Sequence, residues 1–301
     1  MKQDDRPDWV QHKERSHGLI LRLMVWISLT FGRRTGRVVL HAIAAYFVFF
    51  APAARRASRA YLTLALGRRA SWGDGYRHVL AFASTIHDRV YLLNDRFDDF
   101  EIETRGQDEL REVLQDHQGA LLVGAHLGSF EALRSVGRGV GGLKVAMLMY
   151  KENARKLNAT LAAINPMAMQ DVIALGRIES MLEVRDKLDD GYVVGMLADR
   201  TLGGDTTQTV AFLGQPAELP VGPWRMAAML KRPVFFMAGI YLGGNRYRIQ
   251  FERLADFSQV ERAQRDEAIQ SAIVRYADCM TRHCRQAPYN WFNFYDFWKA
   301  R

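Results

Sequence analysis

From about residue 100 onward, short apolar runs alternate with amphipathic stretches of helical length, and this alternation limits the fold more than any other feature of the sequence. Apolar runs of roughly 4–8 residues are typical of buried strands, whereas apolar residues three and four positions apart are typical of helices. Repeated strand–helix units build a largely parallel sheet that is covered on both faces. We therefore predict an α/β fold in which a mostly parallel sheet is flanked by helices.

The predicted elements follow one another as strand–helix pairs. Strands are expected over residues 100–106, 120–126, 144–150, 170–175, 192–199, 233–242 and 246–254, and helices over 108–117, 129–137, 154–164, 177–191, 221–231 and 260–285. Ser129 is the expected N-cap of its helix. The Gly-Gly-Asn sequence at 243–245 predicts a hairpin turn between the last two strands.

The N-terminal part of the chain is basic and apolar instead. Apolar runs cover 19–32 and 38–53, Arg33, Arg34 and Arg37 lie between them, and helical patterns follow over 55–66 and 76–94. Residues 1–70 hold 13 Lys and Arg against four acidic residues, whereas the rest of the chain holds 28 against 29. We predict a basic, apolar, helical region over residues 1–98 that associates with a membrane, followed by an α/β domain over residues 99–301.

Neither apolar run comfortably reaches the ~18–20 apolar residues that cross a bilayer. Arg22 interrupts the first run, and His41 lies within the second. Apolar faces beside clustered Arg suit helices that lie among lipid headgroups and are attracted to anionic lipid. Two alternatives stay open: both runs are buried helices of a helical subdomain, or residues 38–53 form a single tilted span.

Composition excludes several other classes of protein. The chain is 49% hydrophobic and 25% charged, and it has two cysteines; its mean hydropathy is −0.18. These values exclude a disordered chain, a disulfide scaffold and a polytopic membrane protein. We expect no nucleic-acid partner, because the Arg clusters bracket apolar runs that are hard to keep in water beside a duplex. Cys279, His283 and Cys284 suggest a metal site, but the two cysteines do not share a helix face and no second ligand pair is evident, so we expect no metal.

A histidine lies where the strand over 120–126 turns into the next helix. Ligands and catalytic groups of open α/β sheets gather beyond the carboxyl ends of strands. His126 ends this strand, and Glu131 follows one turn into the helix, so the carboxylate can reach the imidazole if the chain turns at Gly128. Glu131 would then fix the tautomer of His126 and stabilise its protonated form. The alternative is a structural histidine beside a surface carboxylate.

The predicted pair has no nucleophile of its own. We therefore expect a hydroxyl group of a substrate to lose its proton to His126 and to attack an activated acyl carbon. Backbone N–H groups near Gly128 are the expected donors to the oxyanion that forms.

The His-x-x-x-x-Glu motif at 126–131 resembles the first signature of the lysophospholipid acyltransferase superfamily. The order of the motifs around it is similar to that of the late acyltransferases of lipid A biosynthesis: an Arg-containing helix, a Gly–strand–Asp element, a Phe-x-Gly turn, a Gly-containing helix and a strand opened by Pro. Here these are Arg177, Gly191 to Asp199, Phe212-Leu213-Gly214, Gly222-Pro223 and Pro233. The resemblance covers about residues 17–298.

This resemblance implies transfer of a fatty acyl group from acyl carrier protein or coenzyme A to a lipid hydroxyl, with no cofactor and no metal. It implies that His126 and Glu131 are catalytic, at the cytoplasmic face of the inner membrane. The expected substrate-binding residues are Arg177, Asp199, Arg200, Phe212 and Gly214. The two arginines could bind a phosphate, and Arg177 could equally form a surface ion pair.

Some of these assignments have alternatives. Residues 212–214 could line an acyl groove or form a buried turn. Arg200-Thr201 and the aromatic segment 289–299 depart from the family pattern, and we interpret the aromatics as core with a wet edge. Because of these departures, a lipid A-type acceptor has two rivals: an aryl-polyene or other glycolipid acceptor, and a non-catalytic scaffold at the membrane surface.

Overall fold

The computed structural model describes residues 18–115, 119–132, 143–150, 171–175, 178–201 and 204–298, with the single residues 153 and 164. Its elements, in chain order, are α2 (Gly18–Phe50), α3 (Pro52–Leu66), α4 (Trp72–Leu93), η1 (Phe97–Asp99), β1 (Glu101–Arg105), α5 (Gln107–Gln115), β2 (Ala120–Gly128), β3 (Val145–Tyr150), β4 (Asp171–Leu175), α8 (Ile178–Asp189), β5 (Val193–Leu197), β6 (Thr207–Phe212), β7 (Gln215–Pro220), α9 (Gly222–Leu230), β8 (Pro233–Gly243), β9 (Arg246–Asp256), η2 (Arg262–Gln264) and α10 (Arg265–Gln286). The predicted helix over 154–164 lies outside the described residues except for its last position.

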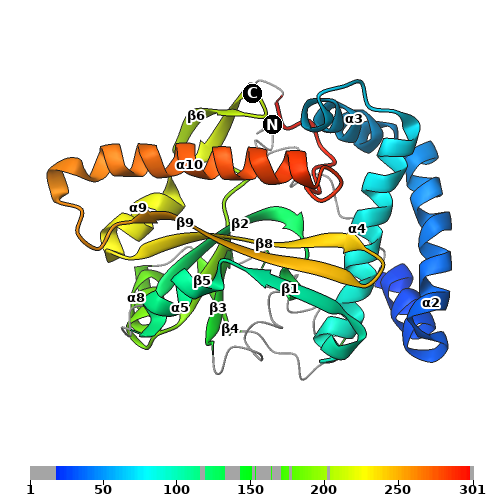
Figure 1. The fold of residues 1–301 in the computed structure, drawn as a ribbon, viewed down its shortest axis with the longest axis horizontal. Helices are drawn as coiled ribbons and strands as arrows, with labels where there is room; N and C mark the ends of the chain where they lie inside the picture. The colour runs from blue at the N-terminus through cyan, green and yellow to red at the C-terminus, as the bar shows by residue number, and fades with distance from the viewer. Residues whose placement is uncertain are drawn as a thin grey trace, which may run out of the picture.

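Seven of the strands form one sheet in the order β1-β9-β8-β2-β5-β3-β4. Every neighbouring pair is parallel except β8 and β9, which form an antiparallel hairpin. In Figure 1 this sheet occupies the centre, α10 runs along one face of it, and α2, α3 and α4 lie together at one end. The prediction of a mostly parallel sheet flanked by helices is therefore confirmed.

A separate two-stranded hairpin, β6–β7, is not predicted by the sequence. The two strands pair antiparallel over their full length. Pro216 and Pro220 lie in β7 and argue against a strand, but a two-stranded hairpin consists only of edge strands, where proline is tolerated. The two residues between the strands, Leu213 and Gly214, both have positive φ values, 53° and 81°. This is the turn geometry that favours a tight hairpin.

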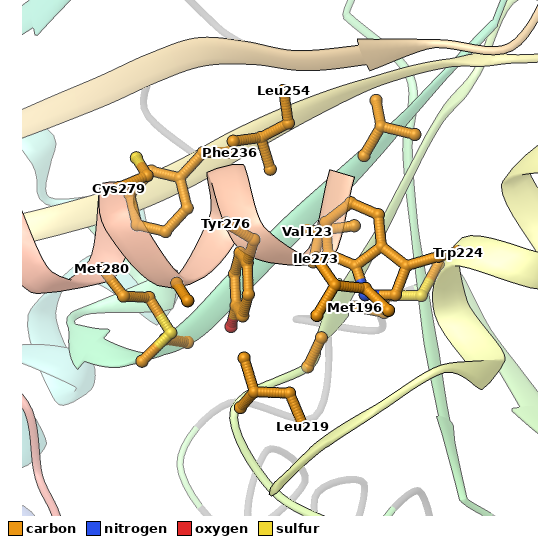
Figure 2. Close-up of a cluster of buried hydrophobic side chains, with 14 of the residues drawn as sticks. Val123, Met196, Leu219, Trp224, Phe236, Leu254, Ile273, Tyr276, Cys279 and Met280 are labelled. Carbon is orange, nitrogen blue, oxygen red and sulfur yellow. The ribbon is translucent and has the colours of Figure 1, made fainter. Parts of the chain in front are cut away.

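Side chains of the central strands alternate between two cores. Leu121 and Val123 of β2 belong to the same buried cluster as Tyr276 of α10, whereas Leu122 packs on the opposite face with Leu110 of α5. Figure 2 shows the first of these clusters around α10. The period of two along the strand thus explains why the sheet is covered on both faces.

The long N-terminal helix α2 bends at Gly32, whose φ of 79° and ψ of 169° are not helical. Its two parts cover the apolar runs at 19–32 and 38–53, except that the second run continues beyond Phe50 and its last residues, Pro52 and Ala53, begin α3. Within the part of the chain that the structure describes, no single helix has both the length and the hydropathy of a membrane span. The pair Gly32–Phe50 and Pro52–Leu66 meets these criteria only when both helices are taken together, and their axes differ by 96°.

A buried carboxylate joins the N-terminal helices to the sheet. Asp88 of α4 is completely buried. Its Oδ1 and Oδ2 accept hydrogen bonds from Nε and Nη2 of Arg33 at 2.8 and 2.9 Å, and Oδ2 also accepts from the Tyr247 hydroxyl at 2.8 Å. A buried anion is stable only with such partners, so this contact fixes α2 and α4 against β9.

His78 of α4 makes a second buried contact between these helices and the rest of the chain. Its Nε2 lies 2.9 Å from the carbonyl oxygen of Trp291 and must donate, because a carbonyl only accepts. Its Nδ1 therefore accepts from the Ser58 hydroxyl of α3, at 2.8 Å. The neutral ring satisfies both contacts. Burial lowers the pKa of His78 to about 4, because a charged ring would lose its water there, and the hydrogen bond to Trp291 offsets this only in part.

This shift predicts a loss of stability in mild acid. Between its ordinary pKa of 6.5 and about 4, the unfolded chain binds a proton at His78 that the folded chain does not. The free energy of unfolding should therefore fall as the pH is lowered through this window, by up to about 3 kcal/mol at about 1.4 kcal/mol for each pKa unit. Urea unfolding at pH 7 and pH 5 measures the change. His78→Gln should show a smaller fall than the wild type, and an equal fall in both proteins would contradict this assignment.

Candidate active site

The candidate site lies where two neighbouring parallel strands end. β2 carries His126 near its end, and Gly124 of β2 is paired with Leu197, the last residue of β5. Asp199 follows β5 by two residues. Because parallel strands end at the same edge of a sheet, His126 and Asp199 meet there although they are 73 positions apart in the chain.

The His126 ring is held by the Asp199 carboxylate. The ring Nδ1 lies 2.8 Å from Oδ1 of Asp199, and the backbone N–H of His126 donates to Oδ2 at 3.1 Å. The Asp199 side chain is completely buried, whereas 35% of the His126 side chain is exposed. The arrangement thus joins a fixed, buried anion to an imidazole that is partly accessible to solvent.

The electrostatics of Asp199 determine the tautomer of His126. Burial raises the pKa of Asp199, but the charges of His126 and Arg200 and the hydrogen bonds from His126 and Trp291 outweigh burial, so its pKa lies below the ordinary value. Asp199 is therefore an anion at neutral pH, and Nδ1 of a neutral His126 must carry the hydrogen that it shares with it. The lone pair is then on Nε2, which can accept a proton.

Glu131 has a different partner from the one that the sequence predicts. The chain does turn at Gly128, and the Ser129 hydroxyl accepts from the backbone N–H of Ala132 at 3.4 Å, as expected of the predicted N-cap. The Glu131 carboxylate is buried, and its Oε1 forms an ion pair with Nε of Arg89, on α4, at 2.7 Å. The carboxylate on Nδ1 of His126 is that of Asp199, so an orienting role of Glu131 stays a prediction.

Two glycines allow the end of β2 to approach β8. A side chain at Gly128, where φ is 74°, would place its Cβ 2.0 Å from the carbonyl oxygen of Gly239, and a Cβ at Gly239 would lie 2.1 Å from the carbonyl oxygen of Ser129. The backbone N–H of Gly128 donates to Asn290 and that of Ser129 to Gly239. The amides at 128 and 129 are therefore engaged within the fold, which argues against the prediction that they bind an oxyanion.

The structure brings only some of the predicted substrate-binding residues to this site. Asp199 contacts the catalytic candidate directly. Arg200 lies beside it, where its Nη2 donates to the carbonyl oxygen of Phe292 at 3.1 Å and its guanidinium lies 5.3 Å from the centre of the Tyr295 ring. Arg177 lies outside the described residues. Phosphate binding by either arginine stays a prediction.

Phe212 is the last residue of β6, and Gly214 lies in the turn that joins β6 to β7. The Phe212 side chain is completely buried, and its ring centre lies 5.1 Å from that of Trp291. Gly214 is exposed and has a positive φ. Phe212 is thus a buried residue beside the turn, and its ring contacts Trp291, which bonds Asp199.

The sequence does not identify the C-terminal segment as part of this site. Phe292 donates its backbone N–H to the carbonyl oxygen of His126 at 2.8 Å, and Leu127 pairs with Trp291 as an antiparallel bridge. The Trp291 indole N–H donates to Oδ2 of Asp199 at 2.9 Å. The high density of aromatic residues near the C-terminus predicts that this segment is part of a core. It does not predict which residues the segment packs against.

A second titratable cluster lies between α10 and β9. Glu252, Cys279 and His283 each have an atom that could bind a metal ion, and these atoms lie within 4.8 Å of one another. Cys284 is not in this group. The Glu252 carboxylate already accepts from His283 at 2.6 Å and from Arg282 at 2.7 Å. Burial raises the pKa of the Cys279 thiol, which therefore stays protonated. These contacts complete an ion-pair network that attaches α10 to the sheet.

Comparison with known proteins identifies the family of the chain. A search of curated proteins finds no match. The family model described as bacterial lipid A biosynthesis acyltransferase matches residues 15–300, which is nearly the whole chain, and so confirms the resemblance that the motifs indicated. The chain belongs to the bacterial lipid A biosynthesis acyltransferase family, and it is an acyltransferase.

Proposed function

We propose that this protein is a membrane-associated O-acyltransferase that moves a fatty acyl group from an acyl thioester to the hydroxyl group of a lipid, with a lipid A-type acceptor. Family membership supports the reaction class. The observation that carries the proposal is the His126–Asp199 pair, because a partly exposed imidazole on a buried carboxylate is the arrangement of a general base.

The proposed reaction needs no nucleophile from the protein. The acceptor hydroxyl gives its proton to Nε2 of His126 as its oxygen forms a bond with the carbonyl carbon of the thioester. Asp199 stabilises the imidazolium that results. When the tetrahedral intermediate collapses, the carbon–sulfur bond breaks and the sulfur leaves as a thiol with the proton from His126. The products are an ester and the free thiol of acyl carrier protein or coenzyme A.

Acyl transfer itself provides the first test. Acyl carrier protein and coenzyme A, each loaded with a radiolabelled acyl group, are incubated separately with the protein and a lipid extract of its host. We expect one labelled lipid with the wild type and none with folded His126→Ala, and the mass of this lipid distinguishes a lipid A-type acceptor from another glycolipid. If a folded wild type transfers no label from either donor, the non-catalytic scaffold is the better interpretation.

A second prediction decides which carboxylate orients His126. Asp199→Asn keeps the shape of the side chain but removes the charge that stabilises the imidazolium, so kcat should fall by about a hundredfold or more with little change in the KM for the donor. Glu131→Gln is the matched variant, since Glu131 is also buried but pairs with Arg89. Steady-state kinetics with proteins of confirmed fold give the comparison. A large loss of kcat in Glu131→Gln alone would restore Glu131 as the orienting group.

We also propose that the N-terminal helices bind the cytoplasmic face of the inner membrane. Large apolar side chains are exposed where α2 ends and α4 begins: Tyr46, Phe47, Phe49, Phe50 and Trp72. The Phe49 and Trp72 rings stack at 6.1 Å, and the Arg55 guanidinium lies 4.6 Å from the centre of the Trp72 ring. Arg56 and Arg59 of α3 are exposed. Exposed aromatic rings beside arginines suit a headgroup region that contains anionic lipid.

Sedimentation with lipid vesicles tests this surface. Phe49→Ser with Phe50→Ser should weaken binding to vesicles of phosphatidylethanolamine and phosphatidylglycerol by about tenfold or more, because each buried Phe contributes about 1.5–3 kcal/mol. Leu182→Ser with Val274→Ser is the control, since both residues are exposed but lie on α8 and α10. Equal binding of the two double variants would exclude the aromatic group as the contact.

A further inference from the structure

The C-terminal segment runs beside the end of β2 and is fixed there by backbone hydrogen bonds. The Gly128 N–H donates to Asn290 at 2.9 Å, and the Phe292 N–H donates to His126 at 2.8 Å. The Asn290 side chain also bonds both backbone groups of Tyr241 in β8, at 2.7 and 3.1 Å. The backbone on both sides of Trp291 is therefore held against the two central strands of the sheet.

The Trp291 side chain is equally restrained. It is 1% exposed. Its ring centre lies 4.9 Å from that of Tyr61 of α3 and 5.0 Å from that of Phe297. Its carbonyl oxygen accepts from His78 of α4. A large aromatic ring that is packed on several sides cannot rotate freely, so the direction of its indole N–H is set by the fold.

That N–H is aimed at the carboxylate that holds His126. Oδ1 of Asp199 is bonded to the His126 ring, whereas Oδ2 is bonded to the His126 backbone N–H and to the Trp291 indole N–H, at 3.1 and 2.9 Å. The two bonds to Oδ2 fix the plane of the carboxylate. If the indole bond is lost, both carboxylate oxygens are still bonded to His126, but the carboxylate is no longer tied to the C-terminal segment, and the direction of the His126 ring is less restrained.

We propose that Trp291 is a positioning residue for acyl transfer, in that its indole N–H fixes the Asp199 carboxylate and thereby the orientation of His126. This inference rests on the proposed function of His126 as the general base. It adds to that function a side chain from the C-terminal aromatic segment.

Trp291→Phe tests the hydrogen bond, and Trp224→Phe is its matched control. Trp224 is also completely buried, and its indole nitrogen has no hydrogen-bond partner among the described residues. Both changes remove the same atoms from the core, but only the first removes a donor from Asp199. We expect kcat to fall about tenfold in Trp291→Phe with an unchanged KM for the donor, while Trp224→Phe keeps the kcat of the wild type.

The pH profile adds a readout that packing alone would not change. Without the indole donor, the charge of Asp199 is less neutralised and holds the imidazolium of His126 more strongly. The acid limb of the kcat/KM profile should therefore move to higher pH in Trp291→Phe and stay in place in Trp224→Phe. If the two variants have equal kcat and equal profiles, Trp291 only fills space and the inference is wrong.

Two further measurements keep the test independent of folding and of activity. If Trp291→Phe does not fold, replacement of Trp291 by β-(3-benzothienyl)alanine keeps the ring shape and removes only the N–H. If the wild type itself transfers no acyl group, the proposed function fails, and NMR titration of the His126 ring then tests the hydrogen-bond chain by itself. A pKa of His126 that is unchanged by loss of the indole donor would overturn the inference in that case.

Discussion

A carboxylate that is completely buried has to be surrounded by hydrogen-bond donors, and the architecture around Asp199 follows from this requirement. Its donors come from β2 and from the C-terminal segment, while Asp199 itself follows β5. Three distant parts of the chain must therefore meet at one edge of the sheet. Because β2 and β5 are neighbours in the sheet, His126 and Asp199 come together there. The pairing of Leu127 with Trp291 adds the C-terminal segment.

The same requirement connects the N-terminal helices to this edge. Tyr61 and Leu62 of α3 belong to the core cluster that also includes the central strands and α10. His78 bonds Trp291, and Asp88 joins α4 to Arg33 and Tyr247. Residues of α3 and α4 thus share buried clusters with the sheet. A domain boundary between residues 98 and 99 stays a prediction.

The sequence predicts the individual elements well, because their signals are local. The run at 120–125 has no polar side chain, as is typical of a strand buried on both faces, and Ser129 is followed by the start of a helix. The position of His126 at a strand end follows from the same reasoning. β6–β7 is missed because its prolines contradict the local pattern of a strand.

The partners within the site could not be predicted, because they depend on strand order. β5 lies next to β2 although β3 and β4 come between them in the chain. Glu131 is near His126 in the sequence, yet it forms an ion pair with Arg89. The carboxylate that is bonded to Nδ1 of His126 is that of Asp199, 73 positions away. Trp291 is farther still from His126 in the sequence. It reaches Asp199 because the C-terminal segment pairs with the end of β2.

The contact between Gly128 and Gly239 has a consequence for how this fold can change over time. Elsewhere in the core, a larger side chain at one position can be offset by a smaller one at its neighbour. Here each missing Cβ faces a backbone carbonyl, at 2.0 and 2.1 Å, and no substitution elsewhere removes a carbonyl. The side chains of the sheet around the site can therefore change one at a time during evolution, whereas this close approach of two parallel strands keeps glycine at both positions.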